Sequence, residues 1–172
     1  MTKFIISGGT PAIASLLNPT VLLHIPFAIH NKELFPLLRK ELITRLPNEC
    51  EVITPRQGED LTEYLKIADT IYVDGGNGDL LFYLLQNTKD FAKKVEGKTC
   101  SGYSAGANVW SKHYYSNDNQ AIITGFGVNS KMTFCHYRNS KISALKQLIL
   151  FKPELEVITL GDNEYQEFYE VS

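Results

Sequence analysis

Residues 99–108, TCSGYSAGAN, combine a short strand, a sharp turn and the start of a helix. The turn, Gly102-Tyr103-Ser104-Ala105-Gly106, has the G-x-S-x-G pattern typical of a nucleophile elbow. Such a turn strains the backbone of its serine, and a Cβ atom at either flanking glycine would clash with the neighbouring chain. The serine hydroxyl is then exposed at a helix N-terminus, where free N–H groups favour a developing anion. Ser104 is therefore a candidate nucleophile, and the alternative is an ordinary glycine turn with a serine cap.

Strands and helices alternate on both sides of this stretch. Apolar and β-branched runs predict strands at 4–6, 21–25, 51–54, 70–73, 99–103, 132–135, 155–160 and 165–171. Helical spacing predicts helices at 33–46, 61–67, 79–86, 89–95, 105–110 and 141–151. This alternation predicts an α/β fold with a mostly parallel sheet covered on both faces, and its ligands should collect at the carboxyl ends of the strands. Without an internal repeat or linker, residues 1–172 are expected to form a single domain.

Composition excludes several classes of protein. A length of 172 residues with 44% hydrophobic residues is enough for one domain with a core, and a net charge of −2 argues against a nucleic-acid partner. Apolar runs stay below the roughly 18 residues of a membrane helix, and the apolar start is too short for a signal peptide. Three cysteines lack metal-type spacing and indicate reduced thiols. We expect a cytoplasmic protein without a membrane partner or a bound metal.

A serine hydroxyl needs a base, and His136 is the favoured candidate. It directly follows the strand at 132–135, so it should lie at the same rim of the sheet as the elbow. The other histidines lie in an apolar strand, in a polar connection, and on or just after the helix that leads away from the elbow: His24, His30 and His113.

The base in turn needs an acidic group to orient it. Asp162 follows the strand at 155–160, which places it at a carboxyl end and gives the order Ser104, His136, Asp162. Asp118 is the main competitor, because it could orient the base or bind a substrate amine, and Glu164 is a third possibility.

The glycine-rich turn Asp74-Gly75-Gly76-Asn77-Gly78 is the second motif. It does not supply the G-x-G-x-x-G fingerprint of dinucleotide binding. Its functional interpretation is an oxyanion donor: the N–H of Gly76 can approach a substrate oxygen because no side chain intervenes, and the N–H of Ala105 is the second donor. The alternative is a plain tight turn.

These motifs resemble the serine dipeptidase E family. The sequence GGN at 75–77, followed by two leucines, is similar to the family's G-G-N-T-x-x-L-L, and GYSAGAN at 102–108 is similar to its G-W-S-A-G-A-N elbow. Asn117-Asp118 resembles a downstream N-D pair, and FCHY at 134–137 resembles the segment that carries the histidine. The resemblance covers about residues 70–165 well and the first half in outline.

The resemblance implies a three-layer α/β sandwich that is flavodoxin-like and similar to class I glutamine amidotransferases. It implies a cofactor-free serine peptidase for small peptides, in a family that includes aspartyl dipeptidases and cyanophycinases. Ser104 would be the nucleophile, His136 the base and Asp162 its orienter, with Gly76 and Ala105 as oxyanion donors. The expected substrate contacts are Asn77, Asp118, Arg138 and Lys141.

The chain departs from the family pattern in ways that affect specificity. Gly78 replaces a threonine, Cys135 replaces the proline before the histidine, and the segment 137–140 is short. We therefore expect only a weak preference for N-terminal aspartate, about tenfold, carried by Arg138, with Lys141 and Arg56 next in line. Alternative functions are an esterase or amidase for non-peptide substrates and a catalytically weak binding protein of the same fold. The expected assembly is a monomer or a homodimer.

Overall fold

A mixed six-stranded sheet forms the larger part of the molecule. The structure is a computed structural model and describes residues 1–16 and 18–171. The strand order is β10-β1-β5-β4-β2-β3, and every neighbouring pair is parallel except β1 with β10. The strands of this sheet are β1 (Thr2–Ser7), β2 (Val21–Ile25), β3 (Glu51–Ile53), β4 (Thr70–Val73), β5 (Thr99–Tyr103) and β10 (Tyr165–Glu170).

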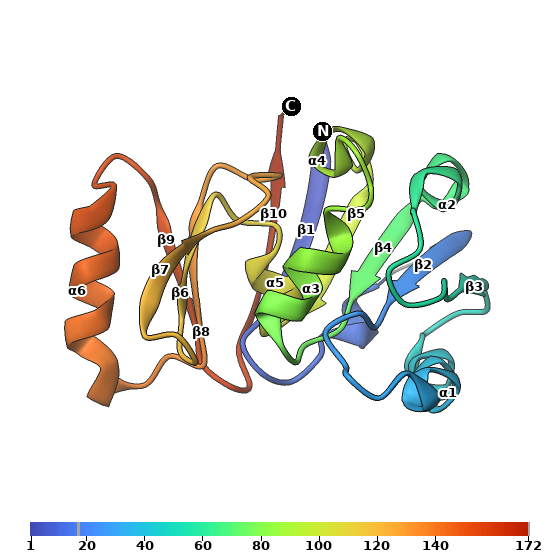
Figure 1. Cartoon of the computed structure of the whole chain (residues 1–172), viewed down its shortest axis with the longest axis horizontal. Helices are drawn as coiled ribbons and strands as arrows, with labels where there is room; N and C mark the ends of the chain where they lie inside the picture. The colour runs from blue at the N-terminus through green and yellow to red at the C-terminus, as the bar shows by residue number, and fades with distance from the viewer. Residues whose placement is uncertain (17, 172) are drawn as a thin grey trace.

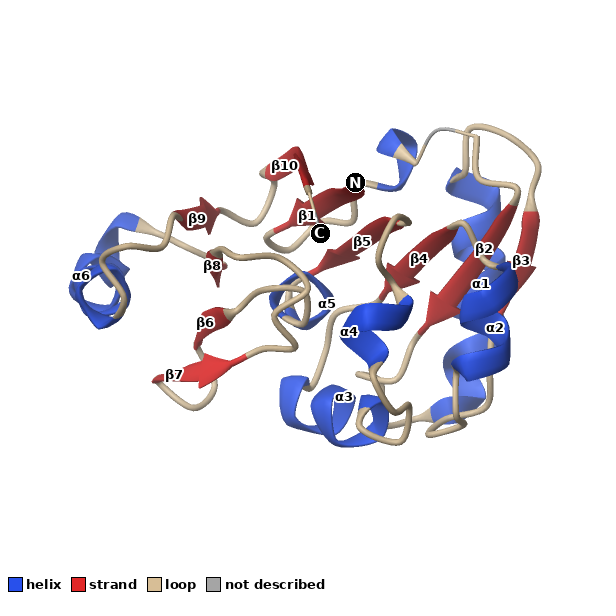
Figure 2. Ribbon diagram, turned by 90° about the horizontal axis from the view of Figure 1, so that it is seen from above, coloured by secondary structure: helices blue, strands red, loops and turns tan. Residues whose placement is uncertain are grey.

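Helices cover both faces of this sheet and complete a three-layer α/β fold (Figures 1 and 2). One face carries α2 (Thr62–Ile67), α3 (Gly78–Leu85), α4 (Phe91–Lys94) and α5 (Ala105–Asn108). The opposite face carries the 3-10 turn η1 (Ile13–Ser15) and helix α1 (Phe35–Arg45), which follows the 3-10 turn η2 (Lys32–Leu34).

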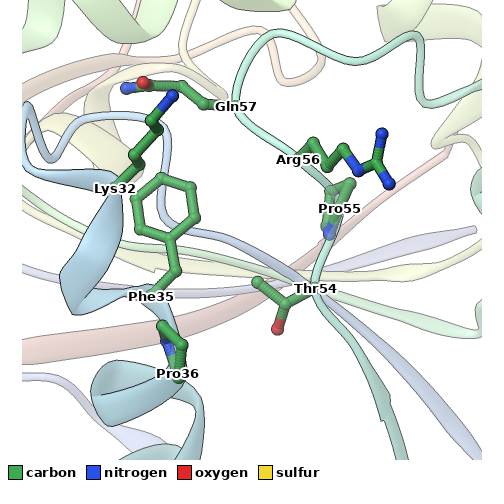
Figure 3. Close-up of a pocket in the computed structure, with 7 residues that line it drawn as sticks. All are labelled: Lys32, Phe35, Pro36, Thr54, Pro55, Arg56 and Gln57. Carbon is green, nitrogen blue, oxygen red and sulfur yellow. The ribbon is translucent and has the colours of Figure 1, made fainter.

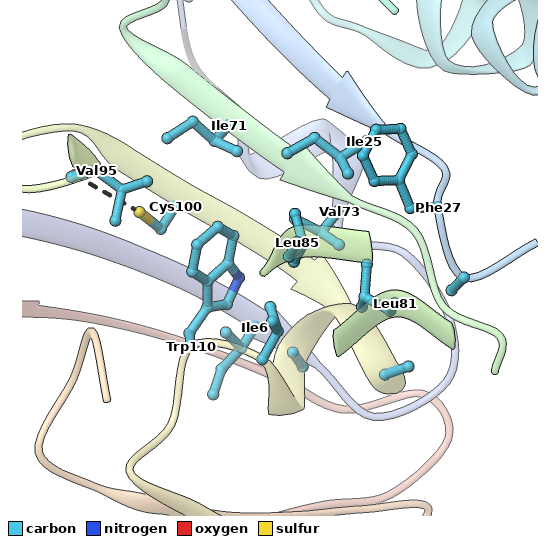
Figure 4. Packing of buried hydrophobic residues seen from close by; sticks show 14 of the residues in the cluster. Ile6, Ile25, Phe27, Ile71, Val73, Leu81, Leu85, Val95, Cys100 and Trp110 are labelled. Atoms are coloured by element: carbon cyan, nitrogen blue, oxygen red, sulfur yellow. Dashed lines mark hydrogen bonds between the residues drawn. The ribbon is translucent and has the colours of Figure 1, made fainter. Parts of the chain in front are cut away.

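The alternation of side chains along each strand builds a separate core under each layer. On β2, Leu23 and Ile25 join the core under α3, while Leu22 joins the core under α1. Figure 4 shows the first core, in which Trp110 fills the space between β1, β5 and the helices. Its indole donates a hydrogen bond to the Ser101 carbonyl oxygen at 3.3 Å, so the polar end of this buried ring is satisfied.

A second, four-stranded sheet continues the molecule beyond β10, in the order β7-β6-β8-β9. Its strands are β6 (His113–Ser116), β7 (Ala121–Thr124), β8 (Met132–Cys135) and β9 (Val157–Leu160). Helix α6 (Ile142–Phe151), entered through the 3-10 turn η3 (Asn139–Lys141), packs on one face through Leu148. The opposite face joins the main core through Cys135, Ile158 and Leu160.

Two features differ from the sequence expectations. The strands expected in one sheet are divided between two, because β8 and β9 pair with β6, whereas β10 returns to pair with β1. Strands β6 and β7 were not expected, and His113, expected on or just after the elbow helix, begins β6.

Within the described residues, no helix has both the length and the apolar character needed to cross a membrane.

Candidate active site

The elbow at the end of β5 holds Ser104 in a strained backbone conformation. Its φ of 53° and ψ of −117° lie where non-glycine residues are rare. The flanking glycines are required by close packing: a Cβ atom at Gly102 would lie 2.4 Å from the Gly106 carbonyl oxygen, and one at Gly106 would lie 2.1 Å from that of Val73. The Ser104 N–H donates to the Ser7 carbonyl oxygen at 3.0 Å, which ties the turn to β1.

A chain of hydrogen bonds runs from this serine to a carboxylate. Ser104 Oγ lies 2.8 Å from His136 Nε2, and His136 Nδ1 lies 2.6 Å from Asp162 Oδ1. Because a carboxylate only accepts, Nδ1 carries the proton and Nε2 is free to accept from the serine hydroxyl. The structure thus brings together the three residues that the ends of β5, β8 and β9 were expected to carry.

Arg138 completes the chain on its outer side. Its Nη2 donates to Asp162 Oδ2 at 2.8 Å, so each carboxylate oxygen has its own partner. The hydrogen bonds from His136 and then Arg138 hold the pKa of Asp162 below its usual value, which keeps the carboxylate ionised at neutral pH. Arg138 lies on the side of Asp162 away from the serine.

The loop that carries Asp162 is hydrogen-bonded to the turn that follows β1. The Thr10 N–H donates to the Asp162 carbonyl oxygen at 2.7 Å, and the Gly8 N–H donates to that of Glu164 at 3.0 Å. The two backbones are so close that a Cβ atom at Gly8 would lie 2.1 Å from the Gly161 carbonyl oxygen. Glu164, one of the alternative orienters, accepts instead from the Gly161 N–H at 2.7 Å.

The Gly75-Gly76 turn after β4 lies directly beside the elbow. A Cβ atom at Gly75 would lie 3.0 Å from the Cβ of Ser104, and one at Gly76, whose φ is 137°, would lie 2.6 Å from the Ala28 carbonyl oxygen. Within residues 1–16 and 18–171, the N–H groups of Gly76 and Ala105 have no protein acceptor. Both donors are thus available near the serine hydroxyl.

A polar cleft of about 440 Å³ opens in front of Ser104. Its charged lining includes two carboxylates, Asp79 and Asp118, and Asn119 donates to Asp79 at 3.2 Å. Burial and the nearby Asp79 charge raise the pKa of Tyr114 to about 12, so its hydroxyl stays protonated. The full lining is Gly76, Asn77, Gly78, Asp79, Ser104, Ala105, Asn108, Tyr114, Ser116, Asn117, Asp118, Asn119 and His136.

The four expected substrate contacts divide into two groups. Asn77 and Asp118 line the cleft, although the Asn77 side chain also accepts from the Leu80 N–H at 2.8 Å and caps α3. Arg138 and Lys141 are not among the lining residues, because each side chain is hydrogen-bonded elsewhere. Arg138 donates to Asp162, and Lys141 donates to the Asn117 side chain and to the His136 carbonyl oxygen.

A small hydrogen-bond network around His136 was not predicted from the sequence. Lys141 Nζ donates to Asn117 Oδ1 at 2.6 Å and to the His136 carbonyl oxygen at 3.1 Å. The Asn117 amide donates in turn to the Cys135 carbonyl oxygen at 2.9 Å. These bonds support the backbone of His136, whose φ of 55° is itself unusual. The polar run after β6 was the available signal, but its partners are set by tertiary structure.

A second cavity, of about 530 Å³, lies between the start of α1 and the turn after β3 (Figure 3). Phe35, Pro36 and Pro55 give it apolar walls, and Lys32 and Arg56 lie at its edge. Neither Ser104 nor His136 lines it. We therefore place the reacting groups at the cleft and not in this larger cavity.

The place of Arg138 predicts how its removal affects catalysis. Arg138→Gln should lower kcat for a neutral substrate about tenfold, because Asp162 loses the donor on its second oxygen. KM should stay within about twofold, since the side chain does not line the cleft. Steady-state kinetics check this, with Arg56→Gln as the control. A rise in KM for acidic substrates without a loss of kcat would instead make Arg138 a substrate contact.

A strained serine between a strand and a helix, within hydrogen-bond distance of a histidine, is the arrangement of serine-type hydrolases. The model of Peptidase family S51 matches residues 10–168. The chain belongs to this family and is a serine-type peptidase.

Solved structures show the same fold. The chain is similar to a candidate peptidase E from Listeria monocytogenes EGD-e, with a TM-score of 0.64 and 20% identity over 99% of this chain and 100% of that one. It is also similar to a peptidase from an acI-B1 Actinobacterium, with a TM-score of 0.68 and 21% identity over 98% of this chain and 83% of that one. No curated protein matches.

Proposed function

We propose that the protein cleaves small peptides, in the manner of a dipeptidase, through Ser104, His136 and Asp162. The observation that carries the proposal is the continuous hydrogen-bond chain from Ser104 through His136 to Asp162 at the mouth of a polar cleft. A cleft of about 440 Å³ has the size of a small-molecule site and suits a peptide of a few residues.

The mechanism follows from the positions of these groups. Ser104 Oγ attacks the scissile carbonyl carbon while His136 Nε2 accepts its proton, and Asp162 stabilises the imidazolium that forms. The N–H groups of Gly76 and Ala105 donate to the oxyanion of the tetrahedral intermediate. The C–N bond then breaks, His136 protonates the leaving amine, and water hydrolyses the acyl-enzyme with His136 again as the base.

The charge of the cleft favours the amino terminus of a peptide. Asp79 and Asp118 line it, and no lysine or arginine is among its lining residues in the described parts of the chain. Their carboxylates suit a free α-ammonium group, which fixes the peptide by its first residue. An acidic first side chain, by contrast, would meet like charge without a cation to pair it, and such an unpaired charge is costly to desolvate.

This distribution of charge predicts the substrate preference. This prediction replaces the weak aspartate preference expected from the sequence, because Arg138 is paired with Asp162 and does not line the cleft. Turnover of Ala-Leu should exceed that of Asp-Leu by about tenfold, worth about 1.4 kcal/mol, and Lys-Leu should be cleaved at least as well as Ala-Leu. The measurement is kcat/KM for the three dipeptides at one pH and ionic strength. Asp118→Asn should narrow the difference between Ala-Leu and Asp-Leu. A wild-type preference for Asp-Leu over Ala-Leu would contradict the electrostatic argument.

The experiment that tests the proposed function is labelling with a fluorophosphonate. Ser104 Oγ attacks phosphorus, fluoride leaves, and the proton passes to His136, so stoichiometric modification at Ser104 is expected. Peptide mapping locates the adduct. Absence of labelling would favour a binding protein over a hydrolase. Turnover of esters but not of dipeptides would place the protein among non-peptide hydrolases.

A further inference from the structure

A buried polar chain crosses the larger sheet beneath the oxyanion turn. His24, on β2, has its ring Nε2 2.7 Å from Asp74 Oδ2 and its Nδ1 3.1 Å from the Thr54 hydroxyl. His24 is 0% exposed and Asp74 is 5% exposed. The pair lies on the α1 face of the sheet, where Asp74 borders a small cavity together with Tyr72, Tyr103 and Arg45.

Stability alone does not account for such a pair. Burying a carboxylate beside an imidazole carries a desolvation cost, and apolar side chains of similar size are often equally stabilising or better in such positions. The neighbouring residues on this face, Leu22 and Tyr72, belong to an apolar cluster that two more apolar side chains would extend. The position of the pair therefore needs another explanation.

Asp74 is the residue immediately before Gly75 and Gly76. These two glycines have no side chains to anchor them, so the turn depends on its ends. At one end, the Asp74 N–H donates to the Ile25 carbonyl oxygen at 3.1 Å, and the Asp74 carboxylate is bound by His24. At the other end, the Asn77 N–H donates to the Ala28 carbonyl oxygen at 2.9 Å. Strand β2 and the segment after it thus hold both ends of the turn.

We propose that His24 and Asp74 are positioning residues that set the direction of the Gly76 N–H toward the oxyanion. The inference rests on the proposed function, because it assigns the Gly75-Gly76 turn a role in stabilising the tetrahedral intermediate. A small rotation at Asp74 would move the Gly76 N–H away from the reacting atom, while the cleft that binds the substrate would keep its lining. The loss should therefore fall on the chemical step and not on binding.

The test measures fluorophosphonate labelling of Ser104, whose phosphonyl oxygen occupies the same oxyanion site. The informative variant is the double substitution His24→Leu and Asp74→Leu, which replaces the buried polar pair with apolar side chains. It should unfold thermally at or above the wild-type temperature. Its labelling rate at saturating probe should fall about 10- to 100-fold. Complete removal of one oxyanion donor sets the upper limit for this decrease in rate. The probe concentration for half-maximal rate should change by less than about threefold.

Single variants and a matched control separate positioning from general damage. Asp74→Asn keeps an acceptor for the His24 ring and should retain labelling within about fivefold, whereas Asp74→Ala should be as slow as the double variant. Leu22→Ala, on the same strand and the same face, should lower the unfolding temperature but not the labelling rate of the folded protein.

The outcomes distinguish this inference from the proposed function. A wild-type protein that is not labelled contradicts the proposed function. A labelled wild type with a double variant labelled equally fast overturns the positioning role and leaves the hydrolase intact. A double variant slowed only in its binding of the probe would also overturn it.

Discussion

Ser104→Ala should reduce peptide turnover by about 10⁵- to 10⁶-fold, because the covalent route through the acyl-enzyme disappears. The side chain lies at an elbow and its hydroxyl bonds only to His136 among the described residues, so little packing is lost. The free energy of unfolding should change by less than about 1 kcal/mol. Initial rates on a dipeptide, together with chemical denaturation, measure both effects.

The control for this substitution is Ser143→Ala, on the exposed side of α6. It removes an exposed serine hydroxyl that has no hydrogen bond to Ser104, His136 or Asp162, and it should leave turnover and stability unchanged. A folded Ser104→Ala protein that retains more than about 1% of the wild-type rate would remove Ser104 from the role of nucleophile.

Asp162→Asn should lower kcat by about 10³- to 10⁴-fold. An asparagine can present its NH₂ group to His136 Nδ1 and so place the imidazole proton on Nε2. In that tautomer the ring can no longer accept the Ser104 proton. KM should change little, because Asp162 does not line the cleft. Steady-state kinetics on a neutral dipeptide measure the two parameters separately.

Two other carboxyl variants test the choice of orienter. Asp118→Asn should raise KM and keep kcat within about threefold, because Asp118 lines the cleft and makes no bond to His136. Glu164→Gln should have a smaller effect on both parameters, since the side chain binds the Gly161 N–H. A kcat loss for Asp118→Asn equal to that for Asp162→Asn would refute the assignment.

Much of the fold could be predicted from local patterns. Apolar and β-branched runs mark β1, β2 and β4, which are buried along almost their whole length. The edge strand β10 alternates exposed and partly buried residues and was recognised from its aromatic side chains. Strands β6 and β7 were not predicted because the polar run 117–120 joins them, and because β6 begins at His113 and ends at Ser116 and so is not an apolar run. The division into two sheets is set by pairing between distant strands, which no local pattern encodes. The leucine-rich side of α1 is only partly buried against the sheet, because Leu42 is buried but Leu37 is 60% exposed.

The candidate site shows the same limit. Ser104, His136 and Asp162 each follow a predicted strand, so their place at carboxyl ends could be anticipated. The prediction assumed a single sheet, whereas β5 lies in the larger sheet and β8 and β9 lie in the smaller one, so the approach of the three residues depends on how the two sheets meet. The partners of Arg138 and Lys141 could not, because both lie in the turn after β8 and their direction depends on how that turn packs. Sequence proximity to the base suggested substrate contacts, whereas the structure pairs these cations with Asp162 and Asn117.

Because the strands divide into two sheets, the proposed catalytic residues come from both parts of the molecule. The proposed nucleophile, Ser104, follows a strand of the larger sheet. His136 and Asp162 follow strands of the smaller one, so the hydrogen bond between Ser104 and His136 joins the two parts. The backbone hydrogen bonds from Gly8 and Thr10 to the Asp162 loop hold the two parts together at this junction. The position of Asp162 relative to Ser104 thus depends on the turn after β1, which lies more than ninety residues before the serine in the chain. A change in this turn would therefore alter the approach of Asp162 and His136 to Ser104 without removing any of the three side chains.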